Sequence, residues 1–270
     1  MWLVTGVSSG LGRAIAEAAL GAGLRVAGTV RNPVDLAAFE ALAPGRAIGV
    51  RLDIADHAAA PAAVAWVEAE VGPIGVLVNN AGYGHEGPIE AIGIADFTRL
   101  YDTNLFGTLA VTQAVLPFMR GRRAGRIINV SSSTSVGGPA GLAAYASSKA
   151  AMNCLSEALA KEVAPFGVRV INLLPGSFRS RWAGASLRRE GYEAYPHLAA
   201  QSEARRQRDG AQTGDPVKFA AVVLQVAEDE DPPLHLILGP TALVAYRNRG
   251  RQMIDDADRS EAMDLDTQYG

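Results

Sequence analysis

Cysteine is nearly absent from this 270-residue chain, in which Cys154 stands alone. A single cysteine cannot form an internal disulfide, and it cannot build a zinc site by itself. Because disulfides are rare in reducing compartments, this composition favours the cytoplasm, where we expect the protein. Cys154 lies in a stretch with a helical pattern, and we interpret it as a small core residue rather than a nucleophile.

Long hydrophobic runs and an excess of either charge are also missing. No apolar run reaches the ~20 residues of a membrane span, and the first residues show no basic signal-peptide start. With 25 basic and 28 acidic residues, the net charge is only -3. Such a weak field gives no general attraction to DNA, RNA or acidic lipid, so we expect no nucleic-acid partner and no membrane contact.

Potential metal ligands do not cluster in the sequence. The four histidines are widely separated: His57, His85, His197 and His235. Without the short spacings of a metal site, all four are interpreted as structural or surface residues, and no metal is predicted. His85 is the one that could also line a substrate pocket, because it follows an Asn-Ala-Gly sequence at a predicted strand end.

Short apolar runs alternate with longer helical patterns along most of the chain. Their near-continuous apolar character predicts strands buried on both faces. We expect strands at 2–5, 24–30, 46–51, 74–79, 125–130, 167–173 and 234–238, and helices at 11–22, 33–42, 56–71, 95–120, 143–164 and 216–227. This predicts an α/β fold with a doubly wound, Rossmann-like parallel sheet of about seven strands and helices on both faces. Since no linker divides the chain, residues 1–270 are predicted to form a single dinucleotide-binding and catalytic domain.

Two segments interrupt this alternation. Residues 177–212 lie between the sixth predicted strand and the next helix, and they carry Arg179, Arg181, Arg188, Arg189, Arg205, Arg206 and Arg208. Because ligands of an open α/β sheet bind beyond the carboxyl ends of its strands, this segment is predicted to be a substrate lid. A solvated pair of surface helices is the alternative. Residues 249–270 lack clear apolar periodicity and are predicted to be a frayed or partner-contacting C-terminal tail.

A glycine-rich turn joins the first predicted strand to the first helix. It reads Thr5-Gly6-Val7-Ser8-Ser9-Gly10-Leu11-Gly12. Glycine permits positive φ and close approach of the backbone to a pyrophosphate. The helix start offers free N–H groups and the positive end of its dipole to the same anion. The position of the turn favours dinucleotide binding over a mere tight connection.

The end of the second strand is expected to select the cofactor. An acid there would bind the ribose 2′-OH of NAD, but the sequence reads Gly28-Thr29-Val30-Arg31-Asn32, with no acid before Asp35. The guanidinium of Arg31 pairs well with a phosphate, and Ser8 or Ser9 could add hydroxyl donors. We therefore predict a preference for NADP(H), with NAD(H) possible. Arg31 as an ordinary surface charge is the alternative.

A tyrosine and a lysine stand four residues apart in Tyr145-Ala146-Ser147-Ser148-Lys149. On a helix both lie on one face. A tyrosine pKa is ordinarily near ~10, and a fixed cation nearby would lower it. Ser132, upstream at the predicted end of the fifth strand, could hydrogen-bond a substrate carbonyl. Together these residues favour proton transfer to or from a carbonyl or alcohol.

These motifs make the sequence resemble the short-chain dehydrogenase/reductase family, in its branch of roughly 250 residues. The matching positions, in the family's order, are the glycine turn, Asn79-Asn80-Ala81-Gly82, Asn104, Ser132, Tyr145, Lys149 and Pro175-Gly176. The resemblance covers residues 2 to about 240. It is highly specific for the family and uninformative about the substrate.

The resemblance implies a role for each catalytic candidate. Tyr145 would be the general acid in carbonyl reduction and the base in alcohol oxidation. Lys149 would lower the Tyr145 pKa and hydrogen-bond the nicotinamide ribose, and Ser132 would hold the substrate oxygen. Asn104 would hold a water that relays protons from Lys149 to solvent, although it could instead only satisfy backbone groups in its helix.

The resemblance also implies a set of cofactor contacts. Besides the turn residues Gly6, Ser8, Ser9, Gly10, Leu11 and Gly12, and Arg31, these are Asp53 and Ile54 at the adenine, Asn80, Ala81 and Gly82 beneath the cofactor, Pro175, Gly176 and Phe178 at the nicotinamide, and Ser180 at its carboxamide. The family more often has threonine at position 180, and serine keeps the hydroxyl. As alternatives, Asp53 could simply start a helix, and Asn79-Asn80 could be turn residues.

The substrate is predicted only as a class. Candidate pocket residues are Ser132, Tyr83, His85, Val136, Leu142 and Trp182, with Phe178 beside them. This mostly apolar set favours a medium-sized ketone or secondary alcohol. An oxoacyl-carrier-protein reductase is the runner-up and would need a basic entry patch, for which Arg120, Arg122 and Arg123 are the nearest candidates. A regulator that senses NADP without turnover is the alternative from another class.

The resemblance further predicts a homodimer or homotetramer built on the helices at 95–120 and 143–164. The first of these carries apolar residues beyond what one sheet face needs: Leu105, Phe106, Leu109, Val115 and Leu116. Oligomers of this kind usually close with two-fold symmetry.

Overall fold

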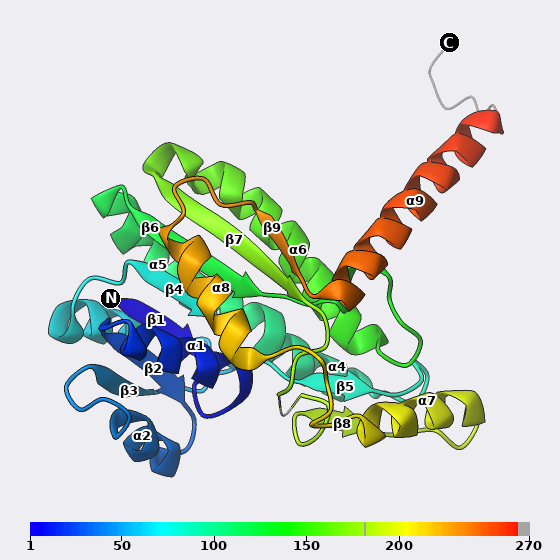
Figure 1. Ribbon diagram of the computed structural model, residues 1–270, viewed down its shortest axis with the longest axis horizontal. Coiled ribbons are helices and arrows are strands. Elements are labelled where there is room, and N and C mark those ends of the chain that lie inside the picture. The colour runs from blue at the N-terminus through cyan, green and yellow to red at the C-terminus, as the bar shows by residue number, and fades with distance from the viewer. Residues whose placement is uncertain (181, 264–270) are drawn as a thin grey trace.

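A seven-stranded parallel sheet forms the centre of the computed structural model, which describes residues 1–180 and 182–263 (Figure 1). The strands are β1 (Trp2–Thr5), β2 (Val26–Val30), β3 (Ala47–Arg51), β4 (Val76–Asn79), β6 (Gly125–Val130), β7 (Val168–Pro175) and β9 (His235–Leu238). They lie in the order β3-β2-β1-β4-β6-β7-β9. The predicted doubly wound, Rossmann-like α/β fold is confirmed, and the order reverses between β1 and β4, where ligands of such sheets bind.

Helices cover both faces because the strands are apolar on both. On one face lie α1 (Gly10–Gly21), α2 (Pro33–Glu40) and α8 (Pro216–Glu228), whose side chains pack on the sheet around Phe39 and Phe219. On the other lie α3 (Ala60–Trp66) with its π-helical continuation η1 (Val67–Val71), α5 (Thr108–Arg122) and α6 (Ala143–Val163). No helix among the described residues is long and apolar enough to cross a membrane.

The long helix predicted at 95–120 is divided. It consists of α4 (Ile94–Tyr101), a π-helical turn η2 (Asp102–Gly107) and α5, and the turn carries Asn104 inward. Two predictions about side chains, one on α5 and one on α6, were wrong. Val115 is fully buried against the sheet rather than part of an exposed apolar surface, and Cys154 lies on the solvent side of α6 rather than in the core.

The predicted lid contains a short strand that the sequence did not indicate, followed by a helix. Strand β8 (Leu187–Arg189) pairs with β5 (Gly84–Glu86) in a separate two-stranded sheet, and α7 (Pro196–Gln207) follows. A short 3₁₀ turn η3 (Ser133–Val136) leads from β6 toward α6. Arg181 of the predicted lid lies outside the described residues.

The C-terminal segment differs from the prediction. Instead of a frayed tail, it forms one long helix, α9 (Pro240–Ala262), which projects away from the sheet (Figure 1). Its residues are polar on most sides, which hid the helical pattern in the sequence. Residues 264–270 of the predicted tail lie outside the described residues.

Two glycines of α1 give a matched test of how tightly this helix packs. A Cβ on Gly12 would collide with the side-chain amide of Asn80 and the carbonyl oxygen of Gly6, whereas a Cβ on Gly21 would meet nothing within 4 Å. We expect Gly12→Ala to lower the free energy of unfolding by about 1–3 kcal/mol, as overpacking does, and Gly21→Ala to leave it unchanged or raise it by about 0.5–1 kcal/mol. Urea denaturation of both variants measures the difference, and equal effects would contradict the close packing at Gly12.

Candidate active site

One large cavity opens at the carboxyl ends of the parallel strands. Its volume is about 1200 Å³. Most residues predicted from the sequence line it: Gly6, Ser8, Ser9, Gly10, Leu11, Arg31, Asp53, Ile54, Asn80, Ala81, Gly82, Tyr83, Ser132, Leu142, Tyr145, Lys149, Pro175, Gly176, Phe178, Ser180 and Trp182. These residues come from six strand ends, from α6 and its start, and from the predicted lid, so the fold brings together positions far apart in the sequence.

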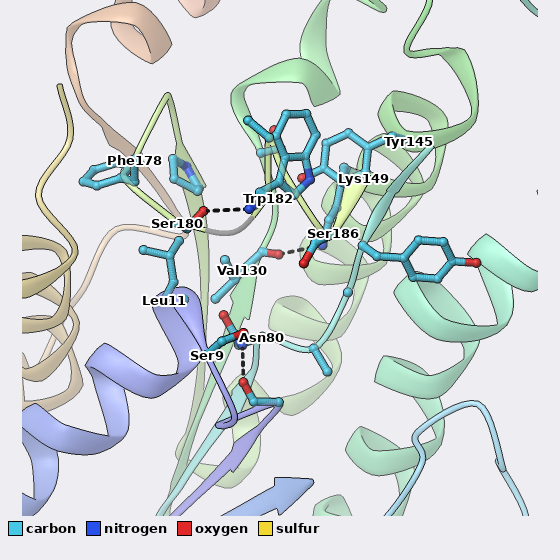
Figure 2. Close-up of a pocket in the computed structure, with 18 of the residues that line it drawn as sticks. Ser9, Leu11, Asn80, Val130, Tyr145, Lys149, Phe178, Ser180, Trp182 and Ser186 are labelled. Carbon is cyan, nitrogen blue, oxygen red and sulfur yellow. Dashed lines mark hydrogen bonds between the residues drawn. The ribbon is translucent and has the colours of Figure 1, made fainter. Parts of the chain in front are cut away.

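The glycine turn follows β1 and lines the cavity between the ends of β2 and β4. Gly6 and Gly10 have φ values of +74° and +63°, which side chains rarely adopt. The side chain of Asn80, at the end of β4, donates hydrogen bonds to the carbonyl oxygens of Thr5 (3.0 Å) and Gly6 (3.2 Å) (Figure 2). The turn is therefore held on the neighbouring strand. Gly12 lies beneath it, packed on Asn80, rather than in the cavity lining.

The turn has the donors that a pyrophosphate requires. No side chain caps the N-terminus of α1, so the backbone N–H groups of its first turn have no side-chain acceptor among the described residues. These groups and the dipole of a twelve-residue helix favour an anion at this place. The elongated cavity, running from the turn to Tyr145, fits a dinucleotide cofactor.

The far end of the cavity is basic at β2 and acidic at β3. Arg31 follows β2, is exposed and lines the cavity, whereas Asp35 belongs to α2 and does not. Asp53 follows β3, and its carboxylate accepts a hydrogen bond from the backbone N–H of Ala55 (3.1 Å). Ile54 is buried beside it.

Tyr145, Lys149 and Ser132 meet at the other end of the cavity, on α6 and at the end of β6. The Lys149 ammonium is only 4% exposed and donates to the carbonyl oxygen of Val130 (2.8 Å), lying 6.0 Å from the centre of the Tyr145 ring (Figure 2). The Ser132 hydroxyl lies next to the phenol and accepts hydrogen bonds from the backbone N–H (3.2 Å) and hydroxyl (3.0 Å) of Thr134. A proton donor and a hydroxyl partner thus face the same space.

Comparisons with known proteins identify the family of this chain. The model of the short chain dehydrogenase family matches residues 1–190. The chain belongs to this family. It is 38% identical over 263 residues to oxidoreductase BOA17 of Botryotinia fuckeliana, covering 96% of this chain and 95% of the relative.

Solved structures extend the comparison to three dimensions. A short-chain dehydrogenase from Streptomyces avermitilis superimposes with a TM-score of 0.91 at 37% identity, covering 99% of this chain and 97% of that one. The closed form of serine dehydrogenase complexed with NADP+ gives a TM-score of 0.78 at 26% identity, covering 88% and 94%. This short-chain dehydrogenase is therefore an NAD(P)-dependent oxidoreductase that acts on a small molecule.

Burial, rather than the lysine, dominates the acidity of the tyrosine in this dehydrogenase. Burial is the largest effect on Tyr145 and raises its pKa to about 12, while the Ser132 hydroxyl and the Trp182 indole beside it act in the opposite direction. Burial likewise lowers the pKa of Lys149 to about 8. Lys149 is not among the causes of the Tyr145 shift, and its ammonium is directed to the Val130 carbonyl, so its effect on the tyrosine pKa stays a prediction.

The side chain of Asn104 is hydrogen-bonded to the backbone of Tyr83 beside the site. Its side-chain oxygen accepts from the N–H of Tyr83 (3.0 Å), and its amide donates to the Tyr83 carbonyl (2.9 Å) and the Ser148 hydroxyl (3.2 Å). A Cβ on Gly82 would lie 2.9 Å from that oxygen and 3.7 Å from the Lys149 nitrogen. Asn104 therefore lies just behind Gly82, outside the cavity lining, and its place in a proton relay stays a prediction.

The substrate end of the cavity is mainly apolar, but two predicted residues do not line it. Trp182 packs its ring 5.0 Å from that of Tyr145, and Leu142 and Tyr83 complete the lining. His85 is instead buried in β5 and contacts Glu190 (2.7 Å), because β5 pairs with β8 there. Val136, at the end of η3, is half-buried and also lies outside the lining.

The basic patch proposed for a carrier protein is at the wrong end of the sheet. Arg120, Arg122 and Arg123 precede the amino end of β6, whereas the cavity opens at the carboxyl ends. Arg122 is also paired with Glu68 (2.8 Å), and Arg123 donates to the Pro165 carbonyl. Besides Arg31, the described arginines that line the cavity are Arg99, Arg188, Arg205 and Arg208.

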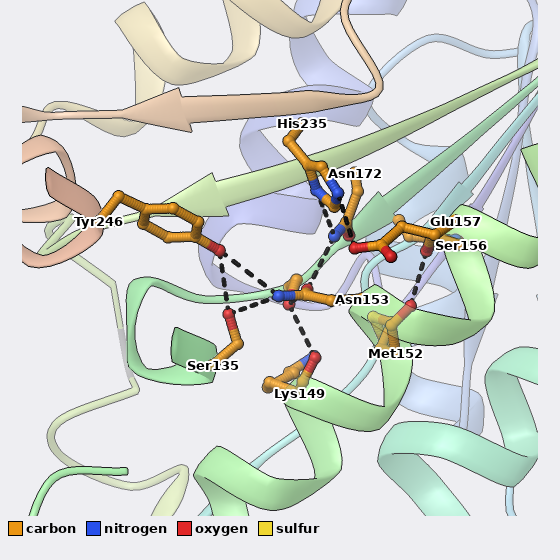
Figure 3. A network of polar contacts seen from close by, with 11 residues as sticks. Ser135, Lys149, Met152, Asn153, Ser156, Glu157, Asn172, His235 and Tyr246 are labelled. Atoms are coloured by element: carbon orange, nitrogen blue, oxygen red, sulfur yellow. Dashed lines mark hydrogen bonds and ion pairs between the residues drawn. The ribbon is translucent and has the colours of Figure 1, made fainter. Parts of the chain in front are cut away.

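Asn153 is a residue that the sequence analysis missed. Its side-chain oxygen accepts from the hydroxyl of Ser131 (2.6 Å) and the amide of Asn172 (2.7 Å), and its amide donates to Ser135 (2.8 Å) (Figure 3). Ser135 in turn donates to the Ser132 carbonyl (2.6 Å). Asn153 therefore ties β6, β7 and η3 to α6. Its position one helical turn beyond Lys149 was the signal in the sequence.

The sequence analysis also missed Glu86, a buried carboxylate that holds the predicted lid against β5. Glu86 in β5 is 2% exposed and forms ion pairs with Arg205 of α7 and with Arg189 of β8 (3.3 Å). It also accepts a hydrogen bond from Ser202 (3.1 Å). Since a buried charge is costly unless paired, these contacts hold β8 and α7 against β5.

The depressed lysine pKa predicts a pH-dependent stability difference. Between the folded pKa of about 8 and the ordinary value of 10.5, the unfolded chain binds the extra proton, so wild-type stability rises with pH in this window. Below about 8 the buried charge costs on the order of 3 kcal/mol. The Lys149→Met variant lacks both that cost and the bond to Val130. We therefore expect its free energy of unfolding to exceed that of the wild type by the largest amount at pH 7.

The measurement is urea denaturation of both proteins at pH 7 and pH 10.5. The advantage of Lys149→Met over wild type should shrink by roughly 3 kcal/mol between the two. Lys161→Met, on the far end of α6, is the control and should show no such shift. A pH-independent difference for Lys149→Met would mean that the folded enzyme does not bury this charge.

Proposed function

We propose that this dehydrogenase transfers hydride between NADP(H) and a ketone or secondary alcohol, with Tyr145 as general acid and base. The observation that carries the proposal is the buried Tyr145 phenol beside the Ser132 hydroxyl, in the same cavity as the glycine turn. When bound, the nicotinamide supplies or accepts the hydride.

Each catalytic side chain has a proposed task that its contacts support. The Ser132 hydroxyl orients the substrate oxygen, and the Tyr145 phenol gives it a proton during reduction. With a pKa of about 12 the phenol is protonated at neutral pH, which is the form that carbonyl reduction needs. Lys149, fixed by the Val130 carbonyl, binds the nicotinamide ribose. Asn104 keeps its proposed role as the holder of a relay water.

The preference for NADP(H) is supported by the surroundings of Arg31. Its guanidinium lines the cavity, and no acid follows β2 before Asp35, which does not line it. The turn residues Ser8 and Ser9 line the same cavity. A 2′-phosphate would therefore find donors there, while a bare 2′-OH would find no carboxylate at the end of β2.

The substrate is proposed to be a medium-sized ketone with a mainly apolar body. Trp182, Leu142 and Tyr83 surround the space in front of Tyr145. Residues 177–212 are proposed to act as a lid, since Trp182 from this segment packs on the catalytic tyrosine and the ion pairs of Glu86 anchor it. A polar group could extend toward the arginines that line the cavity.

Replacing the tyrosine is the direct test of the mechanism. We expect Tyr145→Phe to lower kcat by at least 10²–10⁴-fold, the usual share of general acid–base catalysis, because no proton donor remains. NADPH affinity, titrated by fluorescence, should stay nearly unchanged. Tyr83→Phe removes a phenol that lines the same cavity and should keep most activity.

The assay is NADPH oxidation with aliphatic, aromatic and cyclic ketones. Full activity of Tyr145→Phe would remove the residue from the mechanism, and lost NADPH binding would make it a cofactor-holding residue. A wild-type protein that binds NADPH tightly and turns over none of the panel would favour the regulator that only senses NADP.

Reversing the charge of Arg31, which is proposed to bind the 2′-phosphate of NADP(H), tests the cofactor preference. We expect Arg31→Asp to weaken NADPH binding by about 1.5–3 kcal/mol, the value of charge-assisted hydrogen bonds, and to shift the preference toward NADH. Arg51→Asp is the control, because Arg51 ends the neighbouring strand β3 but does not line the cavity. Tighter binding of NADH than NADPH by the wild type would refute the assignment.

A further inference from the structure

Helix α9 is largely unsupported by the rest of the chain. Its first turns rest on β9 and η3, where Ala242 is buried and the Tyr246 hydroxyl lies 3.2 Å from that of Ser135 (Figure 3). From residue 251 to residue 262 every position is exposed. At 1.5 Å per residue this free part is ~18 Å long. Isolated helices of this length are marginal in water, so a packing partner is needed to stabilise it.

One side of α9 carries an apolar seam. Residues spaced three and four apart in the exposed part of the helix form it: Gly250, Met253, Ile254 and Ala257. This is the spacing of residues that meet between two paired helices. Met253 and its neighbour Ile254 are exposed by 57% and 63%. The small Gly250 and Ala257 would let a second helix approach closely.

The charges of α9 are divided along its length. Its first half carries Arg247, Arg249 and Arg251, and its second half carries Asp255, Asp256, Asp258 and Glu261, with Arg259 as the one exception. Within the described part of the chain, none of these side chains forms an ion pair. The charges are therefore available to a partner.

We propose that α9 is an interaction surface for a second copy of this chain, with the two helices packed antiparallel about a two-fold axis. Antiparallel packing places the basic half of each helix against the acidic half of the other, whereas parallel packing would place like charges together. A self-complementary patch of this kind is what a two-fold contact requires. The contact is distinct from the one predicted on α5 and α6.

The mixed charge of α9 disfavours the other occupants of such a seam. An anionic membrane or a nucleic acid would attract the three arginines but repel the four acids beyond them. An amphipathic helix bound to a lipid surface is typically rich in lysine and arginine along its polar face. A second α9 satisfies both halves at once.

Charge exchange tests the proposal. The basic half is changed in one variant (Arg247→Glu, Arg249→Glu, Arg251→Glu) and the acidic half in another (Asp255→Lys, Asp256→Lys, Asp258→Lys). We expect each variant alone to show half the wild-type mass by light scattering at micromolar concentration, and an equimolar mixture to regain the wild-type mass. Circular dichroism controls for folding. Retention of wild-type mass by both variants, or a monomeric wild type, would overturn the proposal.

Cross-linking tests the direction of the helices. In a Cys154→Ser background, Ile254→Cys lies near the proposed two-fold axis and should form a disulfide-linked dimer on oxidation. Leu243→Cys, 11 positions earlier, would lie ~33 Å from its symmetry mate and should not. Efficient cross-linking at position 243 would indicate parallel helices, and none at position 254 would mean that α9 does not pair. Binding of the wild type to anionic vesicles as a monomer would also refute the pairing.

Discussion

The buried ammonium of Lys149 is the constraint around which this site is arranged. A charge that is almost fully removed from water is costly, and here one backbone carbonyl, that of Val130, is its hydrogen-bond partner. Keeping that carbonyl in place requires the end of β6 to be fixed relative to α6. The polar groups around the strand end serve this purpose.

Asn153 shows how the fixing is achieved. One amide side chain connects Ser131, Ser135 and Asn172, and Ser131 also donates to the Lys149 carbonyl (3.2 Å). The strand end, the turn after it and α6 are thus joined by hydrogen bonds that are partly or fully buried, where they are stronger than in solvent. The resulting rigidity is what a proton donor aimed at a substrate oxygen needs.

The sequence predicted best those features that short segments determine alone. All seven main strands were found because each is apolar on both faces, and the glycine turn and the Tyr145–Lys149 pair were found because their spacing is local. The β5–β8 pair was not, since two three-residue strands 103 positions apart leave no periodic signal. Similarly, His85 and Val136 were misplaced because the direction of a side chain depends on long-range pairing. The helical phase that exposes Cys154 and buries Val115 is likewise set by the sheet.

The packing of Gly12 on Asn80 has an evolutionary consequence. The amide of Asn80 occupies the space that any side chain at position 12 would need, and it also holds the turn that Gly12 supports. Neither position can therefore change first without loss, because a larger residue at 12 displaces the amide and a smaller one at 80 releases the turn. Even simultaneous substitution at the two sites would leave a Cβ at position 12 in collision with the Gly6 carbonyl oxygen. A library that randomises position 12 alone should return glycine.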